Sequence, residues 1–361
     1  MDGTPHQETA KQTVYDHIES PITPHSLTAC KLTGVSPSSQ RVEVIHDLLS
    51  FPFRESPISL TGIQLDYCKE ALNQLSKKQT AFRIIRGNTV DREFDSLCSE
   101  RMQVEKFLSC TSVGRLEINL QKNRYLDIIP YDDTMVLLRG SDGQTSYINA
   151  SYVVDPLHET LPKFIATQGP LPNTNADFWE MVMQQQSPVI VMLTLKKCDN
   201  YFPSESHAFV TFGNIQVTNK ETTISQNGVI YRLLEAKYLQ PDAAISLLVL
   251  HMQLDWPDFG IPSSTAAVRE MFRTLYKVPS NSGPFVVHCS AGIGRTGTFC
   301  TIDHTLRRVL LGDKAAVDIM KTVWQFRMQR FGMVQTKEQY VFCYKAVIEE
   351  LQNLLDKQSS T

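Results

Sequence analysis

The chain of 361 residues lacks the features that mark several large classes of protein. No apolar run is long enough to span a bilayer, since the longest candidate, residues 243–250, has the length of a buried strand. Positive charge is not in excess, because 35 Lys and Arg stand against 38 Asp and Glu. We therefore expect neither a nucleic acid nor a membrane as a partner, and any anion-binding site has to be local.

Cysteine is present but without a pattern. The eight cysteines show no paired C-x-x-C spacing, which argues against a zinc site and against a disulfide framework. The N-terminus has no apolar signal core, and the C-terminus has no prenylation cysteine. We expect a monomeric cytoplasmic protein with reduced thiols and with no metal or cofactor, and the same observations are compatible with a nuclear location.

Composition and periodicity divide the chain into three parts. Residues 1–61 are rich in Ser, Thr and Pro without a sustained period, which predicts a flexible tail. Residues 62–357 begin with helical spacing and continue with strand and helix patterns, which predicts one catalytic domain, and residues 358–361 are expected to fray. Within the domain, residues 206–254 predict successive strands, with turn signals at Asn219, Asn227-Gly228 and Pro241-Asp242. The fold class that we predict is α/β, with a twisted, largely mixed central sheet flanked by helices.

The stretch from Pro284 to Phe299 has the most informative pattern. An apolar, β-branched run at 285–287 predicts a buried strand, a loop of small residues follows, and a helical pattern comes next. Such a loop turns successive backbone N–H groups toward one point, and the positive end of the helix dipole lies there too. The expected guest is an anion. Cys289 stands at the start of the loop and Arg295 at its end.

This placing of a thiol is chemically specific. Backbone N–H donors, a guanidinium and a helix N-terminus should together lower the pKa of Cys289, so that the thiol ionises near neutral pH. Arg295 offers a planar fork that binds two oxygens of a phosphate. The pair predicts phosphoryl transfer through a covalent cysteinyl-phosphate. An accessible thiolate of this kind is also expected to be oxidised reversibly.

The same residues permit two other interpretations. Gly292 to Gly297 also fits the dinucleotide pattern G-x-G-x-x-G, with Asp313 about 20 residues further on. We disfavour it because Asp313 lies in a helix-ending turn and not at the tip of a second strand. A buried structural cysteine is the commonest role of a free Cys, but an arginine six positions on, inside a glycine loop, argues against that role.

The ten residues from His288 to Gly297, His-Cys-Ser-Ala-Gly-Ile-Gly-Arg-Thr-Gly, resemble the signature of the tyrosine-specific, cysteine-dependent protein phosphatases. The resemblance covers about 300 residues, with further motifs in the expected order. It implies the fold of that family and phosphotyrosine proteins as substrates. The chain looks most similar to the small soluble plant members, which act on mitogen-activated protein kinases, and such kinases are therefore a hypothesised substrate.

The resemblance implies a role for each residue of the signature. Cys289 is the nucleophile, and Arg295 binds the phosphate together with the loop between them. The residues of that loop are Ser290, Ala291, Gly292, Ile293 and Gly294. His288 is expected to be buried and to support ionisation of the thiol. Thr296 is expected to donate its hydroxyl to the sulfur, with helix capping as its simpler role.

Residues outside the signature complete the implied site. Asp258, in a Trp-Pro-Asp loop, is the expected general acid, because a phenolate leaves poorly unless it is protonated. Gln335 is implied to position the hydrolytic water, and Gln339 to support it, although both would otherwise pass as polar surface residues. Tyr125 is implied to stack on the substrate ring, and Asp127 to hold the peptide backbone, with a surface turn as its alternative.

Several positions depart from the family pattern. Leu126 stands where some animal members have Arg, and Phe259 stands where His is usual. The loop at 195–203 lacks a glutamate that elsewhere pairs with the catalytic arginine. These departures leave open a second class, a phosphotyrosine-binding module with little turnover. We interpret Arg327 and Arg330 as a solvated helix face in preference to a second phosphate site.

Overall fold

The computed structural model describes residues 58–84, 89–99, 104–140, 143–194, 198–239 and 246–359. The segment predicted as a flexible tail lies outside the described residues except for its last four, among which Ile58 and Leu60 are buried. At the other end of the chain, residues 360 and 361 lie outside them as well. The domain boundaries therefore stay a prediction.

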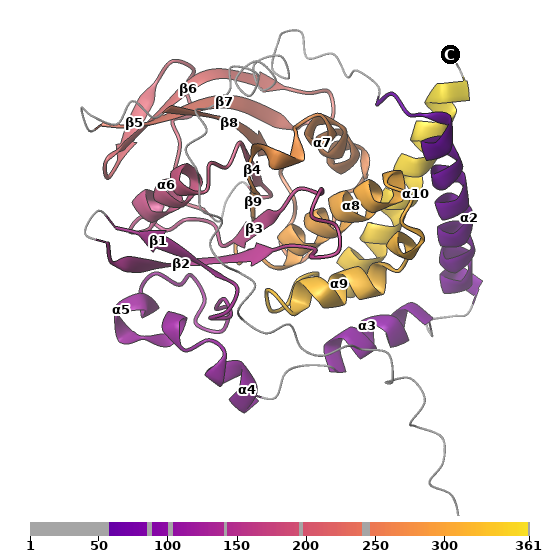
Figure 1. The fold of residues 1–361 in the computed structure, drawn as a ribbon, viewed down its shortest axis with the longest axis horizontal. Helices are drawn as coiled ribbons and strands as arrows, with labels where there is room; N and C mark the ends of the chain where they lie inside the picture. Colours follow the sequence, from indigo (N-terminus) through magenta and orange to yellow (C-terminus); the bar gives the residue numbers. More distant parts are fainter. Residues whose placement is uncertain are drawn as a thin grey trace, which may run out of the picture. The chain divides into compact units, whose positions relative to one another are not determined.

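One mixed sheet of nine strands runs through the described residues, in the order β1-β2-β3-β9-β4-β8-β7-β6-β5 (Figure 1). The strands are β1 (Met135–Arg139), β2 (Thr145–Val153), β3 (Phe164–Thr167), β4 (Val189–Met192), β5 (Phe209–Phe212), β6 (Ile215–Ile224), β7 (Ile230–Tyr238), β8 (Ser246–Gln253) and β9 (Phe285–His288). The four central strands β3, β9, β4 and β8 pair in parallel, and the outer pairs are antiparallel. The predicted mixed sheet is confirmed.

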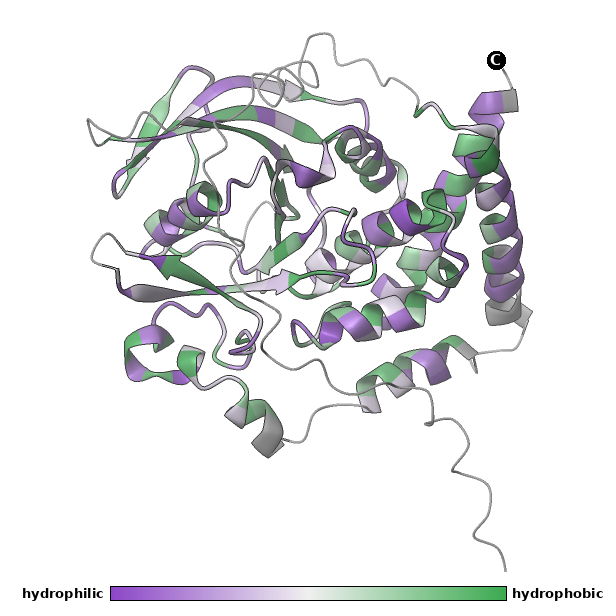
Figure 2. Cartoon of the chain, in the orientation of Figure 1, coloured by the Kyte–Doolittle hydropathy of each residue, from purple (hydrophilic) through white to green (hydrophobic). Residues whose placement is uncertain are grey.

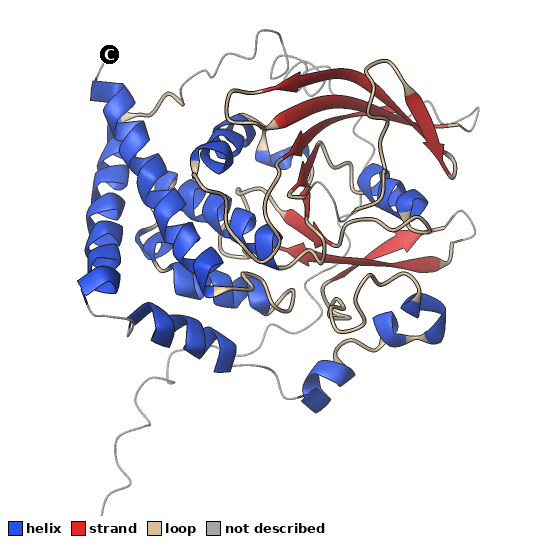
Figure 3. Cartoon of the chain, turned by 180° about the vertical axis from the view of Figure 1, so that it is seen from behind, coloured by secondary structure: helices blue, strands red, loops and turns tan. Residues whose placement is uncertain are grey.

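Helices cover both faces of this sheet. They are α2 (Gly62–Ile84), α3 (Thr89–Ser99), α4 (Val104–Ser109), α5 (Glu117–Leu120), α6 (Asn175–Gln184), α7 (Ala266–Tyr276), α8 (Gly294–Leu310), α9 (Ile319–Arg327) and α10 (Lys337–Ser359), with 3₁₀ turns η2 (Val113–Arg115), η3 (Ser280–Ser282) and η4 (Lys314–Val317). Figure 3 shows α2, α8, α9 and α10 gathered on one side of the sheet and α6 on the other.

Strand β9 connects the two hydrophobic cores. Phe285 and Val287 pack in the core that includes α7, α8, α9 and α10, whereas Val286 packs in the core that includes α6. All three side chains are fully buried, as expected for a strand covered on both faces. Figure 2 shows hydrophobic colouring on the central strands and hydrophilic colouring over much of α2. Because β9 is anchored from both sides, the residue that follows it is held in a fixed position.

The turn predicted at Asn219 is wrong. Asn219 is fully buried within β6, beside an irregularity in the pairing with β7. Its side-chain amide donates to the carbonyls of Pro203 and Ser204, at 3.2 and 3.4 Å. The chain turns instead at Gly213, whose φ is +57°. Asn is a common turn residue, but at this position it satisfies the backbone of an adjacent loop.

Among the described residues, no helix combines the length and the hydrophobicity that crossing a bilayer requires.

Gly283, just before β9, gives a test of how that strand is held. Its φ is +123°, and an added Cβ would lie 2.2 Å from the carbonyl oxygen of Gln186. We expect Gly283→Ala to lower the free energy of unfolding by about 3 kcal/mol, because strain and a backbone clash add. Gly228, at φ +80° with no atom within 4 Å of an added Cβ, is the matched control, and its alanine variant should lose about 1 kcal/mol. If urea titrations gave the same loss of unfolding free energy for Gly283→Ala and Gly228→Ala, the backbone would have shifted to relieve the clash.

Candidate active site

The predicted strand, loop and helix occur in that order. Strand β9 ends at His288, residues 289–293 form the loop, and α8 begins at Gly294. The loop is anchored to β3, because the Gly169 amide, just beyond that strand, donates to the Ser290 carbonyl at 2.9 Å. Since β9 lies between β3 and β4, the loop opens at the carboxyl edge of the parallel part of the sheet.

Only glycine fits at position 292. Its φ is +72°, and an added Cβ would lie 2.0 Å from the carbonyl oxygen of Thr167. The loop therefore lies directly against β3, and no side chain can separate the two backbones.

Cys289 is 2% exposed and lies at the base of the loop. The Gly292 amide donates to its sulfur at 3.3 Å. Burial raises the pKa of the thiol, but the Arg295 guanidinium, the hydroxyl and amide of Thr296 and the Gly292 amide outweigh burial and bring the pKa below its ordinary value. The Thr296 hydroxyl has no hydrogen bond of ordinary geometry within the described residues, so it is available to the sulfur and does not cap the helix.

Arg330 corrects the interpretation of α9 and its end as a solvated face. The side chain is 1% exposed, and burial is the main cause that lowers its pKa to about 10. Its guanidinium donates to the carbonyls of Gly292 and Ala291, at 2.8 and 3.1 Å. The same group donates to Ser151 Oγ and Asn149 Oδ1 on β2, at 3.1 and 2.9 Å. The loop carbonyls are thus held outward, which leaves the loop amides to face the anion site.

Arg327 is not a free surface charge either. Its guanidinium donates to the carbonyls of Met333 and Val334, at 2.9 and 2.7 Å, and to that of Leu97. It fixes the segment that leads to α10. The amphipathic pattern of α9 could not distinguish these buried contacts from solvation.

The loop that carries Asp258 contacts Arg295. Asp258 pairs with Arg295, which also donates to the carbonyl of Trp256 at 3.0 Å. The Trp256 indole donates to the Gly260 carbonyl at 2.9 Å, and its ring packs edge-on against Phe342 of α10. Arg295 is therefore held by the acid loop itself, which answers how it is oriented without the family glutamate.

Phe259, next to the acid, has an unusual conformation. Its φ is +55°, which is rare for a bulky side chain, and its side chain is 64% exposed. The Thr336 hydroxyl lies 3.5 Å from the Phe259 carbonyl. Residues 195–197, in the loop where the glutamate is missing, lie outside the described residues.

Of the two residues expected to contact the substrate, the structure brings Tyr125 to the loop. Its hydroxyl lies 2.8 Å from Ser290 Oγ, and the residue is 37% exposed. Asp127 is exposed two positions away, and it makes no hydrogen bond to the loop within the described residues.

The two glutamines lie against the start of α8. A Cβ added to Gly294 would lie 3.0 Å from the side-chain oxygens of both Gln335 and Gln339. Gln335 is exposed, whereas Gln339 is buried and accepts from the amides of Gln335 and Thr336, at 3.0 and 3.3 Å. Gln339 is thus part of the loop's support and not a surface residue.

His288 lies in a buried polar network that contains no carboxylate. Its Nδ1 is 3.2 Å from the Cys289 carbonyl, and its Nε2 is 2.7 Å from the Tyr201 hydroxyl. The same hydroxyl lies 2.9 Å from His251 Nε2, and His251 Nδ1 is 3.4 Å from Arg232. Burial is the main cause that lowers the pKa of His288 to about 4, so the ring is neutral at pH 7. It acts on the nucleophile through hydrogen bonds and not through charge.

Arg330 and Tyr201 are the residues that sequence reasoning missed. Neither occurs in a local pattern that differs from an ordinary helix end or loop. A signal was present in Arg330, because it lies two positions before Gly332 in a segment that returns to the signature loop.

The dinucleotide alternative is excluded by the position of Asp313. Its carboxylate pairs with Arg308 at 2.6 Å and accepts from the Ala315 amide at 2.8 Å. It therefore closes the turn after α8, and it is not at the end of any strand in the part of the chain that the structure describes. Within the described residues, no group of three or more His, Cys, Asp or Glu is arranged to hold a metal ion.

The contacts of Arg330 with the loop carbonyls predict that this arginine affects the pH at which the Cys289 thiol ionises. We expect Arg330→Met to raise the pH midpoint for alkylation of Cys289 by iodoacetamide by roughly one unit, because a nearby positive charge and the loop geometry are both lost. Arg327→Met removes the same charge from the same segment without touching the loop carbonyls, and it should shift the midpoint less. Equal shifts would assign the effect to charge alone.

Residues 119–349 match the protein-tyrosine phosphatase family. The chain is 42% identical over 318 residues to the Protein-tyrosine-phosphatase PTP1 of Arabidopsis thaliana, which covers 85% of this chain and 92% of that protein.

Animal relatives are similar over a smaller share. Identity to the Tyrosine-protein phosphatase non-receptor type 20 of Rattus norvegicus is 42% over 244 residues, or 66% of this chain and 56% of that protein. Identity to the Tyrosine-protein phosphatase non-receptor type 9 of Homo sapiens is 40% over 254 residues, which is 64% of this chain and 42% of that protein. The matched region contains Cys289, Arg295 and Asp258, and the chain belongs to the protein-tyrosine phosphatase family.

Proposed function

We propose that this chain hydrolyses phosphotyrosine in proteins through a cysteinyl-phosphate. One observation carries the proposal: a buried thiol with a lowered pKa accepts from the Gly292 amide and lies next to a guanidinium that contacts a carboxylate. A thiolate supplies the nucleophile, the amides and Arg295 stabilise the phosphoryl oxygens, and Asp258 supplies the proton.

In the first step, Cys289 Sγ attacks phosphorus while the bond from phosphorus to the phenolic oxygen breaks. Asp258 gives its proton to that oxygen, so that a neutral tyrosine leaves. Arg295 has to exchange Asp258 and the Trp256 carbonyl for two phosphate oxygens. Arrival of the phosphate therefore releases the Asp258 carboxylate from Arg295, and the carboxylate takes up a proton from solvent before it acts as the acid.

In the second step, Asp258 takes a proton from a water that attacks phosphorus, and the bond from sulfur to phosphorus breaks. Inorganic phosphate leaves, and the thiolate is restored. Gln335, whose exposed side chain lies against the start of α8, is suited to orient that water. Thr296 is suited to donate to the departing sulfur, because its hydroxyl is not used elsewhere within the described residues.

Tyr125 supports selectivity for tyrosine. With its hydroxyl on Ser290 and its ring partly exposed, it can form one wall of a slot for a phenyl ring. A shorter phosphoserine would not bring its phosphorus down to the buried sulfur. Depth then discriminates between the two substrates.

We expect phosphate release from a phosphotyrosine peptide but not from its phosphoserine twin, measured without added metal. Cys289→Ser should abolish release, and Asp258→Ala should lower kcat by 10²- to 10⁴-fold, because the phenolate then leaves without a proton. Asp255→Ala, an exposed neighbour outside this machinery, is the matched control. Tight peptide binding without turnover by the unaltered chain would instead support the binding-module alternative.

Mitogen-activated protein kinases are the substrates that we propose, on the similarity to plant members of the family. An Asp258→Ala protein should retain a tyrosine-phosphorylated kinase of this class on a column, because binding persists while leaving-group protonation fails. Vanadate, which competes for the loop, should release it. Failure to retain the kinase, by a variant that still retains a generic phosphotyrosine peptide, would contradict the kinase and leave the reaction intact.

A further inference from the structure

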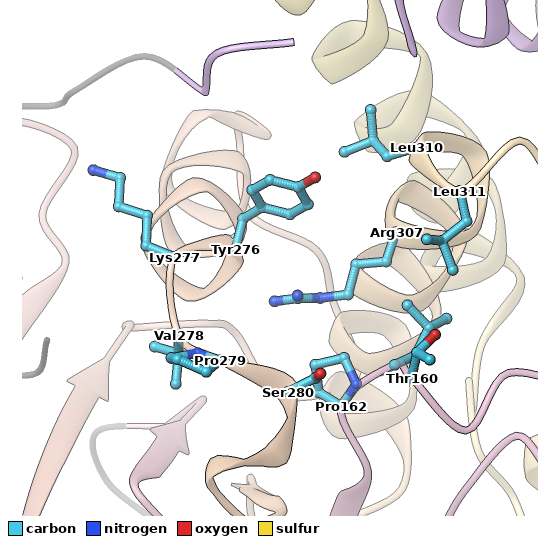
Figure 4. Close-up of a pocket in the computed structure, with 11 residues that line it drawn as sticks. Thr160, Pro162, Tyr276, Lys277, Val278, Pro279, Ser280, Arg307, Leu310 and Leu311 are labelled. Atoms are coloured by element: carbon cyan, nitrogen blue, oxygen red, sulfur yellow. The ribbon is translucent and has the colours of Figure 1, made fainter. Parts of the chain in front are cut away.

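Arg232, on β7, is a buried arginine whose partners are not carboxylates. Other buried arginines pair with an acid: Arg273 with Glu350, Arg295 with Asp258, Arg307 with Asp303 and Arg308 with Asp313. Figure 4 shows one of these, Arg307, beside a cavity between the ends of α7 and α8. Arg232 is 8% exposed, and no carboxylate of the described residues lies within ion-pair distance of it. Burying a charge without a counter-charge is costly, so a role in the function of the site would explain its presence.

The contacts of Arg232 fix the proton of a neighbouring histidine. Its Nη1 donates to Gln253 Oε1 at 2.7 Å and to His251 Nδ1 at 3.4 Å. Because a guanidinium only donates, His251 Nδ1 has to present its lone pair. Burial, followed by the charge of Arg232, lowers the pKa of His251 well below its ordinary value, so the ring is neutral. Its single proton is therefore on Nε2.

The hydroxyl of Tyr201 lies between two histidines. Its oxygen is 2.9 Å from His251 Nε2 and 2.7 Å from His288 Nε2. The residue is fully buried, and the Trp179 indole donates to its backbone carbonyl at 2.6 Å, which holds it in place. A hydroxyl has one proton and can give it to only one of the two rings. Since His251 Nε2 already carries a proton, the hydroxyl donates to His288.

The choice that Tyr201 makes reaches the residue that carries the thiol. With its Nε2 accepting, the neutral ring of His288 has its proton on Nδ1, 3.2 Å from the Cys289 carbonyl. If Tyr201 donated to His251 instead, His288 would have to donate from Nε2 to the hydroxyl oxygen. Its Nδ1 would then turn a lone pair toward the Cys289 carbonyl, which would lose this donor.

We propose that Arg232 is a positioning residue for the nucleophile: it keeps the proton of His251 on Nε2, so that Tyr201 donates to His288 and His288 donates to the Cys289 carbonyl. Arg232 acts only through these residues and touches neither the sulfur nor the phosphate site. The inference rests on the proposed role of Cys289. It is tested by measurements that need no turnover, so its failure and failure of the proposed hydrolysis can be told apart.

The first measurement locates the ring protons. In the full chain labelled with ¹⁵N-histidine, the ring ¹⁵N shifts distinguish a nitrogen that carries a proton from one with a lone pair. At pH 7 we expect the proton on Nε2 of His251 and on Nδ1 of His288. Arg232→Met, which keeps an apolar side chain against Phe202, should move the proton to the other nitrogen in both rings. Lys237→Met removes a charge from an exposed position of the same strand and should move neither.

The second measurement is the pH midpoint for alkylation of Cys289 by iodoacetamide. Arg232→Met should raise the midpoint by about half a unit, because the Cys289 backbone loses a donor that helps to hold the sulfur among its own donors. Lys237→Met should leave the midpoint unchanged.

A double variant separates proton placement from charge and from packing. His251→Phe removes the competing nitrogen and keeps a ring beside Phe202, from which the His251 ring lies 4.4 Å. In Arg232→Met combined with His251→Phe, Tyr201 has only His288 to donate to. The proton of His288 should therefore return to Nδ1, and the midpoint should return to within about 0.2 unit of that of the unaltered chain. A role of Arg232 in charge or packing alone predicts that the double variant is at least as impaired as Arg232→Met.

Three outcomes would overturn the proposal. They are a proton on Nε2 of His288 in the unaltered chain, an unchanged midpoint in Arg232→Met, and a midpoint raised equally in the single and double variants. If Arg232→Met fails to fold, His251→Phe alone decides, since it should leave both the proton of His288 and the midpoint unchanged. A raised midpoint in that variant would contradict the proposed competition between the two histidines.

Discussion

The catalytic loop depends on how its backbone carbonyls are satisfied. When successive N–H groups turn inward to hold an anion, the carbonyls between them turn outward into the protein and need donors there. The buried guanidinium of Arg330 meets two of them, and the amide of Gly169 meets a third. Strand β2 holds Arg330 in turn, through Ser151 and Asn149. The sheet, the helix end and the loop therefore form one hydrogen-bonded unit.

How much of the fold and the site the sequence predicts depends on how far apart in the chain the interacting residues lie. The strand, loop and helix, and the pairing of Cys289 with Arg295, follow from spacing within a few residues, and the sequence predicts them. The burial of Arg330 depends on β2 and on a loop almost 40 positions earlier, so an amphipathic pattern indicates solvent instead. Asn219 is a similar case, because its partners lie in another loop.

The contact between Arg295 and Asp258 links phosphate binding to the position of the loop that carries the acid. In the free site the carboxylate occupies the place where a phosphate would bind, and it satisfies the guanidinium there. On the proposed mechanism, a phosphate dianion, which carries more charge than the carboxylate, takes the place of Asp258 at Arg295. On the proposed mechanism, the position of the Asp258 loop and the binding of substrate are coupled by exchange of partners at the guanidinium of Arg295.

The hydrogen bonds that link Arg232, His251, Tyr201 and His288 all run in one direction. A carbonyl only accepts, so His288 Nδ1 donates to the Cys289 carbonyl and His288 Nε2 accepts from the Tyr201 hydroxyl. The oxygen of that hydroxyl then accepts from His251 Nε2, and His251 Nδ1 presents its lone pair to Arg232. Each imidazole is thereby fixed in a single tautomer, with every proton displaced toward the loop. Reversing one bond would require reversing all of them, and Arg232 at one end and a carbonyl at the other forbid it. All hydrogen bonds of this network therefore point the same way, and the last of them holds the backbone carbonyl of Cys289.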